Sequence, residues 1–223
     1  MISISHDIII PAGSSQVKGI LTVPKGAAAI VIFSHGSGSS RFSPRNSFVA
    51  RVLNERGMAT LLTDLLTPEE DFVYDRRFDI DLLTVRLVAV TNYIHQQAVF
   101  QNFPIGYFGA STGAASAINA AEQLGTLISA IVSRGGRPDL GDGDFPLVKA
   151  PTLLITGGLD VMVTEVNEEV YADLRCEKKM VIVEGATHLF EEEGKLEEVS
   201  ALASDWFEKF LHPHTSPTSK NPP

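Results

Sequence analysis

Short apolar runs recur along the chain and are typical of buried strands. Residues 29–34 form a continuous apolar run, as expected for a strand that is covered on both faces. Two more runs, at residues 2–10 and 17–23, flank the segment Pro11–Ser15 and predict a hairpin. The predicted strands cover residues 2–10, 17–23, 29–34, 58–63, 104–108, 127–133, 151–156 and 179–184.

Helical patterns separate most of these strands. Apolar residues recur every three to four positions between residues 83 and 94, which places them on one face of a helix. Ser43 is suited to cap another helix, with Pro44 at its first position and Gly57 at its end. Further helices are predicted after Gly113, over residues 164–174 and over residues 196–210.

Strands that alternate with helices of this length predict an α/β fold. We expect a mostly parallel central sheet with helices on both faces and no large cap domain. The predicted organisation is a single domain over residues 1–211, followed by a Pro/Ser/Thr-rich tail over residues 212–223. His212 and His214 lie in that tail and are expected to be solvated.

Composition and net charge argue against several classes of protein. The chain has 223 residues, of which 44% are hydrophobic, and a net charge of −9, which argues against nucleic acid as a partner. The N-terminus lacks the basic region of a signal peptide, and we expect no membrane association. The single cysteine, Cys176, suits the reducing cytoplasm. The spacing of Cys and His predicts neither a metal site nor a cofactor.

The segment Gly109-Ala110-Ser111-Thr112-Gly113 lies between a predicted strand and a predicted helix. A Ser flanked by glycines in this context is typical of a nucleophile elbow, a tight turn that exposes the hydroxyl at the carboxyl edge of the sheet. Side chains two positions before or after Ser111 would collide with the neighbouring backbone, which explains both glycines.

An acid and a histidine follow in the order that such a site requires. Asp160 follows the strand at 151–156, and His188 follows the strand at 179–184. The chain order Ser, Asp, His is that of α/β-hydrolases rather than of the other known triad folds. We therefore predict that Ser111, Asp160 and His188 form a catalytic triad.

Each of these residues also has a structural interpretation. Ser111 would act as a helix cap in an inert fold, and His188 would satisfy a backbone carbonyl. Asp160 would cap the helix that follows it, in which case Glu165 or Asp139 would be the acid.

The whole predicted domain resembles the α/β-hydrolase superfamily and, within it, the dienelactone hydrolase-related branch of small members without a cap. The resemblance rests on the segments 34–40, 109–113, 157–160 and 185–188. True dienelactone hydrolases carry Cys where this chain has Ser111, so the resemblance does not imply dienelactone as the substrate. A similar pattern occurs in hydrolase domains attached to phosphoribosyltransferases, but we expect no second domain here.

The resemblance and the chemistry imply the same roles. Ser111 is the nucleophile, His188 accepts and returns its proton, and Asp160 orients the imidazole. The oxyanion of the intermediate needs preset N–H donors. We expect these from Thr112 and Ser37.

The loop after residues 29–34 is expected to supply one of these donors. Gly36 is the alternative to Ser37 as the second donor. His35 is expected to brace this loop through hydrogen bonds.

Irregular segments at residues 38–43, 64–78 and 134–147 are expected to frame the mouth of the site. An open rim of this kind fits compact or short-chain esters. Arg41 and Arg45 suit a carboxylate or phosphate on the substrate. The residues expected to contact the substrate are Gly36, Arg41, Arg45, Phe72 and Leu189.

These observations predict a cytoplasmic serine esterase that cleaves small or short-chain carboxylic esters through an acyl-enzyme. The expected partner is a small-molecule ester, and the expected state is a monomer or a homodimer. Two alternatives stay open. One is a thioesterase or another acyl hydrolase on the same triad. The other is a ligand-binding or sensor protein with a slow, vestigial triad, because fold does not determine function.

Overall fold

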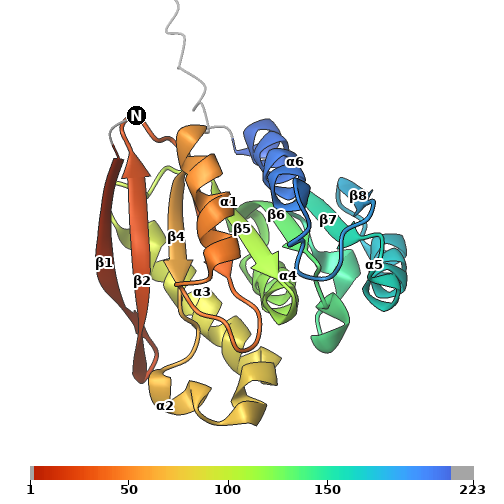
Figure 1. Cartoon of the computed structure of the whole chain (residues 1–223). Helices are drawn as coiled ribbons and strands as arrows, with labels where there is room; N and C mark the ends of the chain where they lie inside the picture. The colour runs from red at the N-terminus through yellow and green to blue at the C-terminus, as the bar shows by residue number, and fades with distance from the viewer. Residues whose placement is uncertain (1–2, 212–223) are drawn as a thin grey trace, which may run out of the picture.

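A computed structural model describes residues 3–211, and Figure 1 shows them as a central sheet between two layers of helices. The predicted tail at 212–223, with His212 and His214, lies outside the described residues. The strands are β1 (Ser3–Ala12), β2 (Ser15–Pro24), β3 (Ile30–Ser34), β4 (Ala59–Thr63), β5 (Ile105–Ala110), β6 (Ile128–Arg134), β7 (Thr152–Gly157) and β8 (Lys178–Val183).

The eight strands form one sheet in the order β1-β2-β4-β3-β5-β6-β7-β8. Adjacent strands are parallel throughout the run β4-β3-β5-β6-β7-β8, whereas β2 pairs antiparallel with both β1 and β4. Among residues 3–211, no large cap domain covers the sheet. The predicted α/β class, with a mostly parallel sheet, is confirmed.

The connection between β1 and β2 is shorter than predicted. Ala12 pairs with Ser15, so only Gly13 and Ser14 form the turn, and the strands extend through most of the expected loop. Gly13 has a φ of +70°, a conformation that glycine adopts readily and that two-residue hairpin turns require.

Helices cover both faces of the sheet. Helices α1 and α6 pack on one face, and α3, α4 and α5 pack on the other (Figure 1). The helices are α1 (Pro44–Glu55), α2 (Pro68–Asp71), α3 (Ile80–Gln96), α4 (Thr112–Leu124), α5 (Val161–Asp173) and α6 (Lys195–Phe210), with short 3₁₀ turns at η1 (Tyr74–Phe78), η2 (Gly125–Leu127), η3 (Pro138–Leu140) and η4 (Phe145–Leu147).

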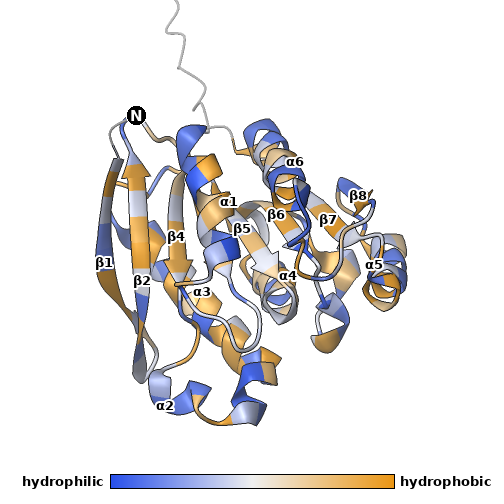
Figure 2. Ribbon diagram, viewed as in Figure 1, coloured by the Kyte–Doolittle hydropathy of each residue, from blue (hydrophilic) through white to orange (hydrophobic). Residues whose placement is uncertain are grey.

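Alternating side chains of the central strands supply two separate cores. On β3, Ile32 packs toward α3 and α4, whereas Phe33 points to the other face and contacts Phe108 with ring centroids 4.9 Å apart. Trp206 of α6 belongs to this second core, as its place on an apolar stripe predicts. Figure 2 shows β4, β6 and β7 as mainly hydrophobic, whereas β1 and β2 carry both hydrophobic and hydrophilic stretches.

The predicted start of α1 is confirmed. The Ser43 hydroxyl accepts a hydrogen bond from the N–H of Asn46, and Pro44 is the first helical residue. Gly57, with a φ of +82°, follows the end of the helix. The N-terminus of α1 directly follows the loop after β3.

The carboxyl ends of the parallel strands gather at one edge of the sheet, where ligands of such folds bind. The segment after β4, which includes α2, lies at this edge (Figure 1). Glu70 of α2 accepts a hydrogen bond of 2.7 Å from the buried guanidinium of Arg86 on α3, so an ion pair ties α2 to the body of the fold. Within residues 3–211, none of the helices has the length and apolarity needed to cross a bilayer.

Candidate active site

Ser111 occupies a strained turn between β5 and α4. Its φ of 53° and ψ of −123° lie outside the conformations that side-chain-bearing residues prefer. A Cβ on Gly109 would lie 2.6 Å from the Cα of Ala114, and a Cβ on Gly113 would lie 2.2 Å from the carbonyl oxygen of Ser34. Neither distance is possible for a real side chain, so the turn requires glycine at both positions.

His188 joins Ser111 to Asp160 through two hydrogen bonds. The distance from His188 Nδ1 to Asp160 Oδ2 is 2.6 Å, and the distance from His188 Nε2 to Ser111 Oγ is 3.2 Å. A carboxylate can only accept, so Nδ1 carries the hydrogen of the neutral imidazole. Nε2 is therefore left to accept the proton of the Ser111 hydroxyl.

The structure brings Asp160, rather than the alternative acids, to the histidine. Asp139 is paired with Arg137 at 2.7 Å, and Glu165 is exposed on α5. Within the described part of the chain, Ser111 and Asp160 make no capping hydrogen bond with their side chains, although each precedes a helix. The catalytic roles of the three residues remain predictions, to which this geometry adds support.

The loop after β3 lies directly against the nucleophile. A Cβ added to Gly36 would be 3.1 Å from the Cβ of Ser111. Thr112 is the first residue of α4, so no carbonyl of its own helix can accept from its N–H. The Ser37 N–H donates to the hydroxyl of Thr112 at 2.8 Å. Both residues predicted to form the oxyanion hole therefore lie together beside Ser111.

His35 stabilises this loop through two hydrogen bonds of its ring, as expected. Its Nδ1–H donates to the carbonyl of Gly36 at 2.9 Å, and its Nε2 accepts from the N–H of Leu65 at 3.3 Å. Burial lowers the pKa of the imidazole below its usual value, so the neutral form is favoured. His35 thus links the loop after β3 to the loop after β4.

A pocket of about 230 Å³ opens beside Ser111 and His188. Three of the residues expected to contact the substrate line it, namely Gly36, Arg45 and Leu189. It is also lined by two buried polar residues that the sequence analysis missed, Asn46 and Arg134. A charged residue directly after an apolar strand is the signal that would have identified Arg134, because it places the charge at the carboxyl edge of the sheet.

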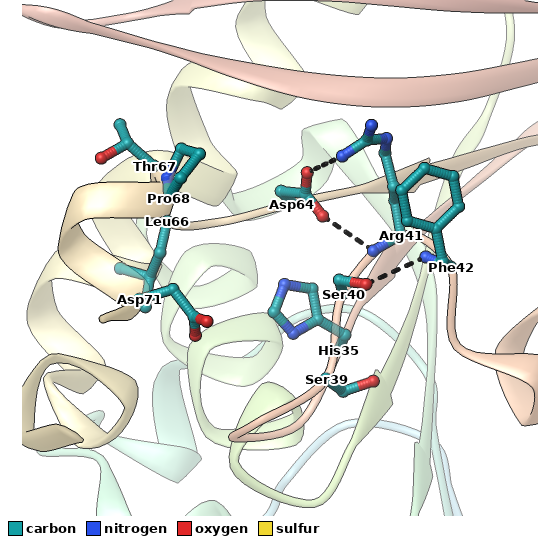
Figure 3. Close-up of a pocket in the computed structure, with 10 residues that line it drawn as sticks. All are labelled: His35, Ser39, Ser40, Arg41, Phe42, Asp64, Leu66, Thr67, Pro68 and Asp71. Atoms are coloured by element: carbon teal, nitrogen blue, oxygen red, sulfur yellow. Dashed lines mark hydrogen bonds and ion pairs between the residues drawn. The ribbon is translucent and has the colours of Figure 1, made fainter. Parts of the chain in front are cut away.

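Arg41 and Phe72 lie elsewhere. Arg41 lines a neighbouring cavity, where its guanidinium and its backbone N–H both bind the carboxylate of Asp64 (Figure 3). Its charge is therefore neutralised within the fold. The Phe72 side chain is 89% exposed, and it lines neither this cavity nor the pocket at Ser111 in the part of the chain that the structure describes. Contact of these two residues with the substrate remains a prediction.

Several solved structures match this chain over nearly its whole length, and one of them does so at high sequence identity. Dienelactone hydrolase from Anabaena variabilis is 48% identical, and the alignment covers 94% of this chain and 99% of that chain with a TM-score of 0.91. An identity this high over both full lengths shows common family membership and not only a common fold.

A longer protein from Mycobacterium tuberculosis, named "Putative phosphoribosyl transferase", is 51% identical over 202 residues. The alignment covers 91% of this chain but 46% of that protein. This chain therefore spans about half the length of the curated relatives that it matches, and their name applies to the longer protein.

Esterases share the fold at lower identity. An esterase from Pyrococcus furiosus is 18% identical, with 93% of this chain and 92% of that chain covered and a TM-score of 0.78. No family model matches the chain. At this identity the esterases show the fold alone, whereas the 48% identical dienelactone hydrolase supports an enzyme of the hydrolase kind. The identity and coverage of the Anabaena structure show that this chain belongs to the dienelactone hydrolase-related branch of the α/β-hydrolases.

Proposed function

We propose that this protein is a serine hydrolase that cleaves small carboxylic esters through an acyl-enzyme on Ser111. The continuous hydrogen-bond chain from Ser111 through His188 to Asp160, built on a strained elbow, is the observation that carries the proposal. These hydrogen bonds hold the three side chains within reach of one another, which supports the roles of nucleophile, base and orienting group that acyl transfer requires.

The proposed reaction begins with attack of the Ser111 oxygen on the ester carbonyl while His188 Nε2 takes the hydroxyl proton. Asp160 stabilises the imidazolium that forms. The imidazolium then protonates the departing alcohol, which leaves the acyl group on Ser111. A water molecule, deprotonated by His188, releases the acid and restores the hydroxyl.

Two backbone N–H groups are proposed to stabilise the oxyanion of each tetrahedral intermediate. The Thr112 N–H stands at the start of α4, where the helix dipole also favours negative charge. The Ser37 N–H is the second donor, and it must turn from the hydroxyl of Thr112 or be shared with the oxyanion. Loss of one such donor typically raises the barrier by about 3–4 kcal/mol.

The size of the pocket supports a small substrate. A cavity of about 230 Å³ is smaller than the pockets of roughly 300–1,000 Å³ that hold drug-sized ligands. We accordingly expect short esters to be better substrates than long-chain lipid esters.

Stopped-flow hydrolysis of p-nitrophenyl acetate, butyrate and octanoate by the wild type and by Ser111→Ala tests the proposal. We expect a burst of p-nitrophenol followed by steady turnover in the wild type and loss of both phases in the variant. Mass spectrometry of the quenched wild type should show one acyl adduct on the peptide that contains Ser111. Equal turnover by the two proteins would reject Ser111 as the nucleophile, and a burst without turnover would favour a sensor.

A further inference from the structure

A second pocket lies at the amino ends of β5 and β6, at the opposite edge of the sheet from the proposed nucleophile. Its volume of about 400 Å³ lies within the range of pockets that hold small ligands. Pro104, which lines it, directly precedes β5, whereas Ser111 follows the other end of that strand. The six residues of β5 span about 20 Å, so this pocket is separate from the candidate active site.

The chemistry of the pocket lining is uncharged apart from one imidazole. The lining side chains that can form hydrogen bonds are His95, Gln101, Asn102, Thr126 and Ser129. The other lining residues are apolar, and within residues 3–211 no Asp, Glu, Lys or Arg lines the pocket. A charged group of a ligand would therefore find no counter-ion there, which is unfavourable when the group leaves water.

The five polar side chains are available to a ligand. Within residues 3–211, none of them takes part in a hydrogen bond with another protein group. The Nδ1 atom of His95 is also buried and has no partner in that range. Because buried polar atoms of native proteins are nearly always satisfied, an unpaired one indicates a water molecule or a ligand in the site.

A bulge in β6 brings Ser129 to the pocket. Ile105 of β5 pairs with Ile128 of β6. The next residue of β5, Gly106, pairs with Ala130, so Ser129 is an extra residue with no residue opposite it. Both of its neighbours in β6 are buried, whereas Ser129 is half-buried and lines the pocket. Bulges re-aim side chains and are over-represented beside functional sites.

The turn that carries Gln101 and Asn102 is held in place without a ligand. The N–H of Phe100 donates to the carbonyl of Gln97 at 2.9 Å, and the N–H of Phe103 donates to the carbonyl of Phe100 at 2.9 Å. Phe100 is buried, and the ring of Phe103 packs edge-on against it with centroids 5.4 Å apart. The pocket is therefore largely formed in advance, as ligand sites usually are.

We propose that this pocket binds a neutral, hydroxyl-rich small molecule, a sugar or a polyol. Each hydroxyl of such a ligand both donates and accepts, and side-chain amides and hydroxyls can do the same. Phe103, which also lines the pocket, offers an apolar surface to the C–H groups of the ligand. The inference goes beyond the proposed function, because the site is separate from Ser111 and binding there needs no turnover.

Titrations followed by ¹H–¹⁵N NMR test the proposal on the whole chain. The probes are two matched pairs, glucose with glucose 6-phosphate and myo-inositol with inositol 1-phosphate. We expect at least one neutral probe to shift the amide signals of residues 101–103 and 126–129, with a Kd on the order of 1 mM. The charged member of that pair should bind at least about fivefold more weakly. The two pairs distinguish a sugar ring from a polyol.

Two variants test the assigned residues. Asn102→Ala removes one amide, and Ser129→Val removes the hydroxyl while it keeps a side chain suited to a strand. We expect each to raise Kd by about three- to tenfold, as for one lost hydrogen bond. Asn92→Ala is the matched control, because Asn92 is exposed on α3 outside the pocket, and it should keep the wild-type Kd. Circular dichroism checks that each variant is folded.

Three outcomes would overturn the inference. The first is that neither neutral probe shifts these signals at about 100 mM, well above the expected Kd. The second is that the charged and neutral members of both pairs bind equally, and the third is that Asn102→Ala and Asn92→Ala bind as the wild type does. Signal shifts confined to the surroundings of Ser111 also reject this site, because they place the sugar in the candidate active site.

Discussion

The backbone N–H of Ser37 donates a 2.8 Å hydrogen bond to the side-chain hydroxyl of Thr112. The carbonyl of the same peptide group, that of Gly36, accepts from His35 Nδ1. Both polar ends of this peptide are therefore held by side chains from different elements, one in α4 and the other at the end of β3. These two hydrogen bonds tie the loop that faces Ser111 to α4 and to the residue that follows β3.

Replacement of Thr112 by Val should loosen this loop. The Val side chain has nearly the same shape but cannot accept from the Ser37 N–H, which is left without its partner. We expect kcat for p-nitrophenyl butyrate to fall by about tenfold, the equivalent of one lost hydrogen bond. Thr112→Ser keeps the hydroxyl and should retain most of the activity. A rise in kcat in Thr112→Val would instead mean that the hydroxyl competes with the oxyanion for this N–H.

Asp160→Asn should inactivate the enzyme without unfolding it. The Asn amide can donate to His188 Nδ1, which moves the imidazole proton to Nε2 and leaves no base for Ser111. A loss of about 10⁴-fold in kcat is expected. Glu165→Gln, a change of the alternative acid on the exposed side of α5, should keep wild-type kcat. The assignment of the acid is wrong if the two variants behave in the opposite way.

Gly113→Ala should strongly destabilise the fold. The added Cβ would lie 2.2 Å from the carbonyl oxygen of Ser34, and both atoms belong to rigid elements. Overpacking of this kind costs about 3 kcal/mol in the free energy of unfolding, measured by urea denaturation. Gly158→Ala is a matched control because its nearest contacts would be at 3.4 Å, so we expect a change of less than about 0.5 kcal/mol.

The burial of His35 should make stability depend on pH. Its pKa is lowered in the folded protein, chiefly by burial, from an ordinary value of 6.5. Well above pH 6.5 the imidazole is neutral in both the folded and the unfolded protein, so His35 does not lower the free energy of unfolding there. As the pH falls below 6.5, the unfolded chain binds a proton that the folded chain refuses, and stability declines until the folded pKa is reached.

Comparison of Tm between pH 7.5 and pH 5 checks this expectation. His35→Gln lacks the titrating group, so its Tm should fall less over this range than that of the wild type. The Gln amide has both a donor for the Gly36 carbonyl and an acceptor for the Leu65 N–H. Parallel curves for the two proteins would show that His35 does not contribute to the pH dependence.

Sequence was sufficient for the features that depend on local chemistry. Runs of apolar residues predicted the strands, and Ser43 with Pro44 predicted the start of α1, because burial and capping act over a few neighbouring positions. The order of Ser111, Asp160 and His188 predicted that the three would meet, since each follows a parallel strand and all parallel strands end at one edge.

Only the tertiary structure shows which charged side chains are paired within the fold. Asp139 and Arg41 lie within segments that the sequence predicts to frame the site, yet Asp139 pairs with Arg137 and Arg41 pairs with Asp64. Arg134 was missed in the sequence analysis, and the strand order places its strand, β6, directly beside β5 and the elbow. Ion pairing and burial depend on neighbours that are distant in the chain, so only the packed structure reveals that the buried Nε of Arg134, in the pocket with Ser111, has no hydrogen-bond partner within residues 3–211.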